Sequence, residues 1–530
     1  MLTIDKLAQK YVLIFVLLAY ICLAYLPLIF EGGIIVDDWG DISHNLSCNG
    51  FFNCYLTWFP LFSNRPLAPL PITLSTFLFQ THFSLYLILN SFLYLLSIFI
   101  TARIISYLVG NFSATTFILI AAIPCIAMPL IASPINQLTA TLSFVFWATS
   151  LNSLFNYCFQ GKNGQYLLAY LLLLCGFLTY EVILPLLVLS ALLPYLLDKN
   201  IFNSNRILYL VKYILPILSI LVIVILWQKI IAPQFMEVDS RLKFEPSQIL
   251  AKIHTWAHVF YAQLPSLFLK SIDLISTYDI LSGIVLVATF YLSWRFYRLQ
   301  PNQLKGSFYF VLTGILCFFA SSLIFILSGE SATSWGYQAR GLSSTWFAFA
   351  ILLSGLVSSN FPSIAIRNYI FTPMVIIVTC LSLLVFSIQR DNYVKSWKLQ
   401  QFIIKDALNL IKLNKLTPDA TVIGNVPKFL NPNFNDEIVF SQSWDFGAAL
   451  SIYTQSLVIS GAVIDSRRGD FKKVQFQGDS IILDGWWKGH TSNMWFYDFD
   501  PAAKKGTIIR VKDINDLKNI FDGLQMKPIL

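Results

Sequence analysis

The sequence predicts an α-helical polytopic membrane protein with about eleven transmembrane helices and a small C-terminal α/β domain. Of its 530 residues, 56% are hydrophobic and only 12% are charged. Soluble domains carry about 25% charged residues, so this chain has too little polar surface to cover a water-soluble globule. Long apolar runs separated by polar breaks recur up to about residue 388, and short β-branched runs follow them.

Eleven apolar runs approach the length of about 20 residues that a helix needs to cross a bilayer. No small-residue cleavage site follows the first run, so we expect that run to remain as an anchor. Pro124, Pro129 and Pro185 predict broken or kinked helices, which are tolerated where neighbouring helices satisfy the freed carbonyl groups. We place the spans at 11–30, 81–107, 113–132, 136–158, 165–180, 182–198, 213–231, 279–297, 307–327, 341–358 and 369–388.

The positive charges beside these spans predict the orientation of the chain. Cytoplasmic loops of membrane proteins carry an excess of Lys and Arg, and the charges near the span ends all fall on the side of the N-terminus. The formal charge of +8 is therefore attributed to loop anchors and not to nucleic-acid binding. The residues concerned are Lys6, Lys10, Arg103, Lys162, Lys199, Arg206, Lys212, Arg295, Arg298, Lys305 and Arg367.

This orientation divides the chain into two expected parts in the inner membrane of a bacterium, with the N-terminus cytoplasmic. The membrane module covers 1–388 and places the loops 31–80, 232–278 and 328–340 on the outer face. The remainder, 389–530, lies outside as a periplasmic α/β domain. It opens with a helical pattern at 400–415, continues with short strands and ends with a helix that Asp513 caps.

Two segments of this C-terminal domain have side chains suited to binding. Trp444, Asp445, Trp486 and Trp487 lie in aromatic and polar stretches that fit either stacking on a glycan or packing in a small core. The basic turn RRGDFKK at 467–473 fits either contact with an anionic lipid or glycan, or an ordinary solvated surface.

The first outer loop carries the sharpest signal for chemistry. It begins IIVDDWGDISHN, so that Asp37 and Asp38 directly follow a spanning helix and Asp41 comes three residues later. Carboxylates at a membrane edge are costly when buried and usually functional when they face a cavity. The alternative is that these carboxylates face bulk water as ordinary loop residues without a function. The loop continues with an aromatic run, WFPLF, that suits the membrane interface, and with Arg65 in SNRPLAPLP.

An acidic first outer loop followed by an interfacial helix resembles the GT-C superfamily of integral membrane glycosyltransferases. DDWGD, NRPL and the later TYEVILPL make the chain look similar to the bacterial O-antigen glucosyltransferase and protein O-mannosyltransferase-like group. The resemblance implies a sugar transfer from a polyprenyl-phosphate donor to a surface-glycan or lipid-linked acceptor, with inversion at the anomeric carbon. It implies Asp38, or else Asp37, as the catalytic base. We interpret Asp37 as positioning the acceptor when Asp38 is the base, and Arg65 and Arg340 as cations that hold the leaving phosphate. Some members bind a divalent metal, so metal dependence is left open, and no nucleic-acid partner is expected.

Further residues are candidates for substrate binding. Glu181 lies in the apolar TYEVILPL and fits either a sugar or acceptor contact or a structural hydrogen bond to the backbone or to a neighbouring tyrosine. Arg340, beside Tyr337, fits either a phosphate or sugar contact or an interfacial anchor. Glu330 in the same loop fits either a weaker role in binding or a pair with Arg340. Arg241 and Lys243 in the second outer loop are further phosphate candidates.

Two pairs of residues each allow two interpretations. His254 and His258 share one helix face but lack the Glu of an HExxH motif, so packing is favoured over metal binding. Cys48 and Cys54 flank a polar stretch of the first outer loop, where a disulfide and free thiols are both compatible with an oxidising compartment.

Two other functional classes fit the composition. An O-antigen polymerase or ligase would share the membrane and the lipid-linked donor, but would carry its signature arginines in large middle loops. A lipid or solute transporter would have paired charges at mid-membrane and repeated halves. The charges of this chain gather at one face instead, which favours surface chemistry.

Overall fold

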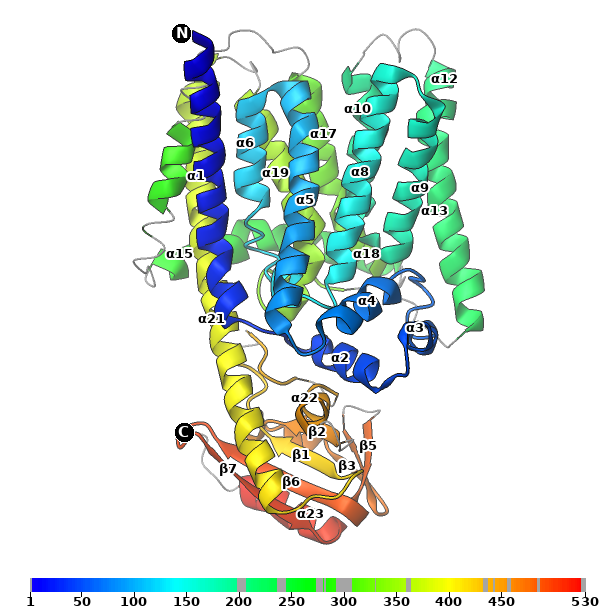
Figure 1. Ribbon diagram of the computed structural model, residues 1–530, viewed down its shortest axis with the longest axis vertical. Helices are drawn as coiled ribbons and strands as arrows, with labels where there is room; N and C mark the ends of the chain where they lie inside the picture. The colour runs from blue at the N-terminus through cyan, green and yellow to red at the C-terminus, as the bar shows by residue number, and fades with distance from the viewer. Residues whose placement is uncertain are drawn as a thin grey trace.

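The protein is an elongated bundle of helices with an α/β domain at one end, and the N-terminus lies at the opposite end (Figure 1). This computed structural model describes residues 2–197, 206–235, 245–272, 280, 283–291, 307–328, 330–358, 364–431, 437–441, 444–454, 459–483 and 487–525.

The helical bundle contains the expected spans. Each of the eleven predicted segments contains helix in the described residues, although the one at 279–297 is described only over part of its length. Six helical segments of the described chain are long and apolar enough to cross a membrane, and shorter apolar helices accompany them. The main bundle helices are α1 (Leu2–Glu31), α5 (Phe83–Val109), α6 (Asn111–Ala121), α8 (Leu138–Gln160), α9 (Asn163–Thr179), α10 (Leu187–Leu197), α13 (Leu215–Leu226), α17 (Ser307–Ala320), α18 (Ser322–Ser328), α19 (Ser343–Ser358) and α21 (Thr372–Leu413).

The prolines break the chain where the sequence predicts. Helix α6 ends at Ala121, well short of a full span, and the chain continues as buried turns through Pro124 to the short helix α7 (Pro129–Ala132). Irregular backbone at membrane depth is tolerated only when protein groups satisfy it. The last carbonyls of α6 each accept a side-chain hydrogen bond: Leu119 from Tyr20, Ile120 from Trp346, Ala121 from Tyr94 and Ala122 from Tyr25.

Helix α21 joins the bundle to the α/β domain. Its 42 residues run without interruption, a length of about 60 Å that exceeds the thickness of a bilayer. The two helical patterns expected at 369–388 and 400–415 are thus parts of one helix, and Figure 1 shows it running beside α1. Buried Arg390 fastens the two helices by donating to the carbonyls of Leu23 and Ala24. The Leu23 carbonyl needs such a donor because Pro27, one turn later, has no N–H.

The C-terminal domain contains two sheets. The larger has the strand order β2-β1-β6-β7, in which β1 (Thr421–Asn425) is parallel to both β2 (Ser460–Ile464) and β6 (Met494–Asp500), and β7 (Lys505–Val511) is antiparallel to β6. The smaller is an antiparallel sheet of β3 (Gln475–Gln477), β4 (Ser480–Leu483) and β5 (Trp487–His490). Among the β-branched runs that predict strands, EIVFSQ at 437–442 forms only an isolated bridge at Ile438 within its described residues, and β3, β5 and β6 lie outside the predicted runs.

Helices cover both faces of the larger sheet. The end of α21 contributes Ile403 and Ala407 to a core shared with Val422 of β1. Helix α23 (Ile514–Gln525) contributes Leu517 to the opposite core, which includes Ile423. The Asp513 carboxylate accepts from the backbone N–H groups of residues 515 and 516, which is the predicted helix cap.

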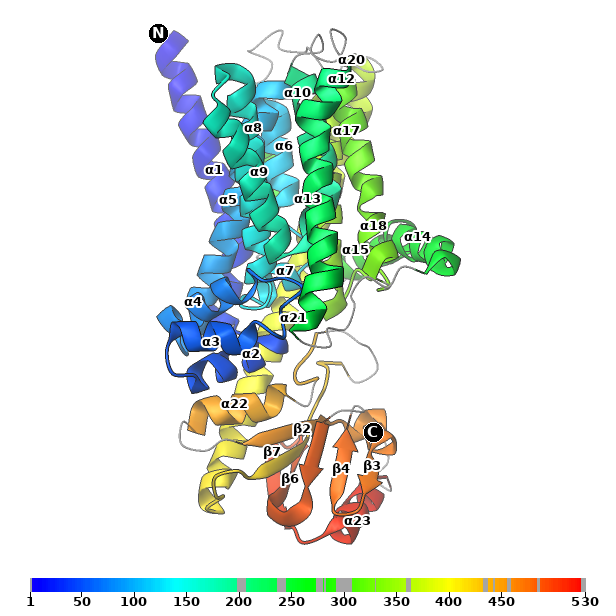
Figure 2. The ribbon, with the colours of Figure 1, turned by 90° about the vertical axis from the view of Figure 1, so that its right-hand side faces the viewer.

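The first outer loop lies between the bundle and the C-terminal domain (Figures 1 and 2). It folds into α2 (Asp37–Ser47), α3 (Phe51–Trp58) and α4 (Pro69–Phe79). Part of the second outer loop forms α14 (Ile249–His258) and α15 (Leu264–Ile272), and α14 projects sideways from the bundle in Figure 2. Helix α2 packs on α22 (Asp445–Thr454) of the C-terminal domain, so both parts of the chain hold the acidic loop.

Candidate active site

Helix α2 starts at a strained turn that directly precedes Asp37 and Asp38. Val36, which precedes the helix, has φ 47° and ψ −114°, a conformation that is rare for a β-branched residue. Such strain persists only where the surrounding structure enforces it, and it is concentrated at functional sites. Asp37 and Asp38 then occupy the first turn and make different contacts.

Asp38 anchors the loop inside the protein. Its side chain is fully buried. One carboxylate oxygen accepts from the Ser133 hydroxyl at 3.0 Å and from the N–H groups of Ile135 and Asn136 at 3.2 and 2.8 Å, and the other accepts from the Ile35 N–H at 3.2 Å. Burial raises the pKa of Asp38 to about 7, and the hydrogen bonds that it accepts oppose this rise.

These contacts do not suit the expected role of Asp38 as the base. Four donors from two segments already use both of its oxygens, and the side chain has no exposed surface. The motif alone could not distinguish the two aspartates, because adjacent residues at a helix start point in different directions and only packing decides which one is buried.

Asp37 is the more accessible carboxylate. Its side chain is 25% exposed, and its Oδ2 atom accepts from the Tyr337 hydroxyl at 2.8 Å. The Arg340 Nη1 atom lies 3.5 Å from the same oxygen, and the Arg340 guanidinium also covers the Tyr337 ring at 4.1 Å. Tyr337 and Arg340 both come from the 3-10 helix η7 (Tyr337–Leu342) that leads into α19. No hydrogen bond to the Asp37 Oδ1 atom occurs within the described chain, so this oxygen is available to a substrate.

Asp41 adds a third carboxylate to this site, on the same face of α2 as Asp37. It is 4% exposed, and within the described residues its Oδ2 atom has no hydrogen-bond partner. Burial raises the pKa of Asp41 well above its ordinary value, and the charges of Asp37 and Asp38 add to this effect. Asn136 connects Asp41 to the partner of Asp37. Its side chain forms a hydrogen bond with Asp41 that opposes the rise in the pKa of Asp41, and its Oδ1 atom lies 3.5 Å from the Tyr337 hydroxyl.

A second polar cluster is formed by Arg65 and Glu181. The Arg65 Nε and Nη2 atoms lie 2.6 and 2.5 Å from Glu181 Oε2, while Gln228 donates to Glu181 Oε1 at 2.6 Å. The Arg65 guanidinium also covers the ring of Tyr180 at 3.8 Å. Glu181 is thus held by an arginine and a glutamine, two partners that the sequence did not indicate.

The two clusters are neighbours. Tyr180 interacts electrostatically with both Arg65 and Arg340, and the two arginines also influence each other, so the two guanidinium groups lie near the same tyrosine. The fold thereby brings together five of the predicted residues, Asp37, Arg65, Glu181, Tyr337 and Arg340, from three separate parts of the chain. Sequence reasoning missed Tyr180, Asn136 and Gln228, and only the position of Tyr180 next to Glu181 could have signalled one of them.

Other predicted residues lie elsewhere. Arg241 and Lys243 fall outside the described residues. Arg340 pairs with Asp37 and not with Glu330, which is exposed. His254 and His258 stack with ring centroids 6.1 Å apart, and Tyr261 contacts both rings, which fits packing. Cys48 and Cys54 are free thiols. Among the described residues, no group of three or more His, Cys, Asp or Glu side chains is placed to hold a metal ion.

Comparisons with known proteins find similarity in structure alone. No family model and no curated protein sequence matches the chain. Among solved structures, it is similar to ArnT from Cupriavidus metallidurans bound to undecaprenyl phosphate, with 13% identity, a TM-score of 0.38, and coverage of 85% of this chain and 86% of that one. The apo form of ArnT gives 13% identity, a TM-score of 0.37 and 94% coverage of each chain.

Proposed function

We propose that this chain is an inverting glycosyltransferase of the GT-C type. It transfers a sugar from a polyprenyl-phosphate donor to a cell-envelope glycan or lipid-linked acceptor on the outer face of a bacterial inner membrane. The observation that carries this proposal is the Asp37 carboxylate at the end of the bundle, which has one oxygen held by Tyr337 and Arg340 and the other open.

Asp37 is the base in this proposal. Its Oδ1 atom accepts the proton of an acceptor hydroxyl as that oxygen attacks the anomeric carbon of the donor. The bond from the anomeric carbon to the phosphate oxygen breaks, and its electron pair leaves with the polyprenyl phosphate. Attack from the face opposite the leaving group inverts the anomeric centre. Tyr337 fixes the orientation of the base, and Asp38 holds the loop that carries it.

Arg340 is the best-placed partner for the leaving phosphate. Its side chain is 23% exposed, and its contact with Asp37, at 3.5 Å, is long for a charge-assisted hydrogen bond. Arg65 is more deeply buried, with its guanidinium committed to Glu181, so it adds positive charge near the phosphate and supports the wall of the site. Preorganised cations at a developing negative charge are an effective source of transition-state stabilisation.

The orientation of the chain is part of the proposal. The C-terminal ends of α5 and α8 lie at the end of the bundle that holds the N-terminus (Figure 1). In the sequence, Arg103 lies in the last turns of α5 and Lys162 follows α8. Because positive loops remain in the cytoplasm, the candidate site and the C-terminal domain are assigned to the periplasmic side.

The experiment is transfer of a radiolabelled sugar from polyprenyl-phosphate donor in membranes that contain either the wild type or Asp37→Asn. We expect Asp37→Asn to lower the rate roughly 10²- to 10⁴-fold, the usual contribution of a general base. Glu31→Gln is the matched control. Glu31 is an exposed carboxylate at the last residue of α1, shortly before Asp37, and it pairs with Lys398. The activity of this variant should stay close to that of the wild type. Full transfer by a folded Asp37→Asn protein would refute the assignment.

A further inference from the structure

The larger sheet of the C-terminal domain has a topological switch point. The chain leaves β1 for β2 on one side and later returns to β6 on the other side of β1. In open α/β sheets, ligands bind outside the carboxyl ends of the strands at such a point. Asn425 ends β1 here, and its side-chain amide donates to Asp498 of β6 at 2.6 Å.

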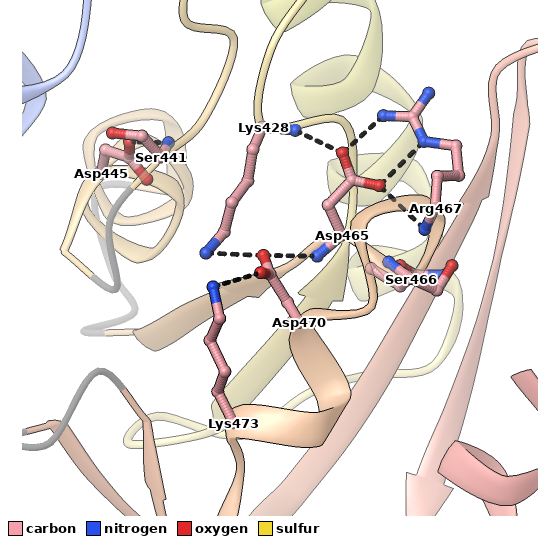
Figure 3. Close-up of polar contacts among 9 residues, drawn as sticks. Lys428, Ser441, Asp445, Asp465, Ser466, Arg467, Asp470 and Lys473 are labelled. Carbon is pink, nitrogen blue, oxygen red and sulfur yellow. Dashed lines mark hydrogen bonds and ion pairs between the residues drawn. The ribbon is translucent and has the colours of Figure 1, made fainter. Parts of the chain in front are cut away.

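Charged side chains gather at this edge of the sheet (Figure 3). Asp465, which follows β2 and is 1% exposed, accepts from the Arg467 guanidinium at 2.8 and 2.7 Å and from the Lys428 backbone N–H at 3.0 Å. Asp470 is also buried, and it pairs with the ammonium groups of Lys428 at 2.8 Å and Lys473 at 3.3 Å. The basic turn 467–473 is therefore folded onto the carboxyl ends of the strands.

Among the residues joined by these ion pairs, the three cations Lys428, Arg467 and Lys473 outnumber the two carboxylates of Asp465 and Asp470. Two ammonium groups share the single carboxylate of Asp470, and Figure 3 shows both on the same side of it, towards Ser441 and Asp445. Each ammonium has three donors, and Asp470 uses one from each lysine. Like charges held close together repel one another, so an incoming anion that binds both lysines would be favoured.

The cluster also lies on the side of the domain that meets the bundle. Phe429, next to Lys428, packs against the main hydrophobic core of the bundle, and the Ser396 hydroxyl of α21 donates to the Ile438 carbonyl at 2.5 Å. The guanidinium of Arg468 covers the Phe429 ring at 4.6 Å. A ligand held here would thus lie at the same end of the bundle as the candidate active site.

We propose that Lys428 and Lys473 bind an anionic group, a phosphate or a carboxylate, of the acceptor saccharide. This inference rests on the proposed function and adds the chemical class of the acceptor, namely an acidic glycan. The site would bind a part of the acceptor that is distant from its reacting hydroxyl. It would therefore contribute affinity and orientation without taking part in the chemistry.

Direct binding to the full-length protein in detergent tests this proposal without requiring catalysis. The probe is hexagalacturonate, with neutral maltohexaose for comparison, measured by isothermal titration calorimetry. We expect hexagalacturonate to bind with an affinity that falls as salt is added, and maltohexaose to bind more weakly. Lys473→Gln should weaken hexagalacturonate binding roughly tenfold, the typical loss for one hydrogen bond to a charged group. Its side chain is 75% exposed, so the fold should survive.

Two control variants separate the possible failures. Lys512→Gln removes an exposed lysine after β7, at the opposite edge of the sheet, and should bind like the wild type. Asp37→Asn should also bind like the wild type, so loss of the proposed chemistry and loss of this site are distinguishable. Equal binding by the wild type and Lys473→Gln would overturn the proposal. A second result would also overturn the proposal: binding to nanodiscs that contain phosphatidylglycerol, dependent on Lys473, with no binding to hexagalacturonate. The bound anion would then be a lipid headgroup.

Discussion

The Tyr337 hydroxyl donates a 2.8 Å hydrogen bond to the Asp37 carboxylate across 300 residues of sequence. This contact ties the start of α2 to the helix η7 that precedes α19, and it leaves the second oxygen of Asp37 open. It is the contact that distinguishes the two adjacent aspartates of the first outer loop.

Tyr337→Phe tests this contact directly. Removing the hydroxyl frees the Asp37 side chain to rotate, so we expect the transfer rate to fall roughly tenfold, equivalent to one charge-assisted hydrogen bond. Initial rates of sugar transfer measure the effect. Tyr166→Phe is the control, because its hydroxyl bonds the Lys212 carbonyl at the other end of the bundle. Equal losses in both variants would show a general effect on packing and contradict the prediction.

Glu181→Gln should destabilise the protein through Arg65. The variant leaves a largely buried guanidinium without its counter-charge, and we expect a cost of roughly 2 kcal/mol, between the values typical of exposed and buried ion pairs. Thermal unfolding in detergent provides the measurement. A double-mutant cycle uses the single variants Arg65→Met and Glu181→Met. The double variant Arg65→Met/Glu181→Met should lose less stability than these two losses added together, because it leaves no unpaired charge. Strict additivity would mean that the pair is not coupled.

Gly33→Ala should disturb the packing that supports α2. A Cβ atom at residue 33 would lie 2.2 Å from the ring of Trp397, which stacks on buried Trp39. We expect a loss of about 1–3 kcal/mol from overpacking together with reduced transfer activity. Gly164→Ala is the matched control, since an added Cβ there meets nothing within 4 Å and α9 should gain up to about 1 kcal/mol. Unchanged stability of Gly33→Ala would show that the Trp397 contact can relax.

Asp41→Asn should change how stability depends on pH. The pKa of Asp41 is raised in the folded protein, so its favourable contribution is complete below its unfolded-state pKa of about 3.9 and is lost as the pH rises through the folded-state value. The unfolding temperature of the wild type should therefore fall relative to that of Asp41→Asn as the pH is raised above about 4.

The pH series needs a control for carboxylates in general. Asp522 is exposed on α23, so Asp522→Asn should follow the wild type at every pH. A constant difference between the wild type and Asp41→Asn across the series would mean that Asp41 does not titrate as its burial requires.

The architecture was predictable because it depends on local patterns. Apolar runs of membrane length, interrupted at Pro124 and Pro129, predict both the spans and the break after α6. The change to short β-branched runs predicts the α/β domain. The position of the acidic residues directly after the first span also predicted that they lie at the end of the bundle opposite the N-terminus.

The roles of individual residues depend on contacts between distant segments. Asp37 and Asp38 are adjacent and chemically identical in the sequence, and only the donors from residues 133–136 and from Tyr337 separate an anchor from an open carboxylate. Likewise, the indole N–H of Trp39 donates to Gln400 across 361 residues, which fastens α2 to α21. The sequence determined which residues directly follow the first apolar run and therefore lie at one end of the helical bundle. The tertiary structure decided which of them are buried, because burial depends on which segments pack together and not on the residue type.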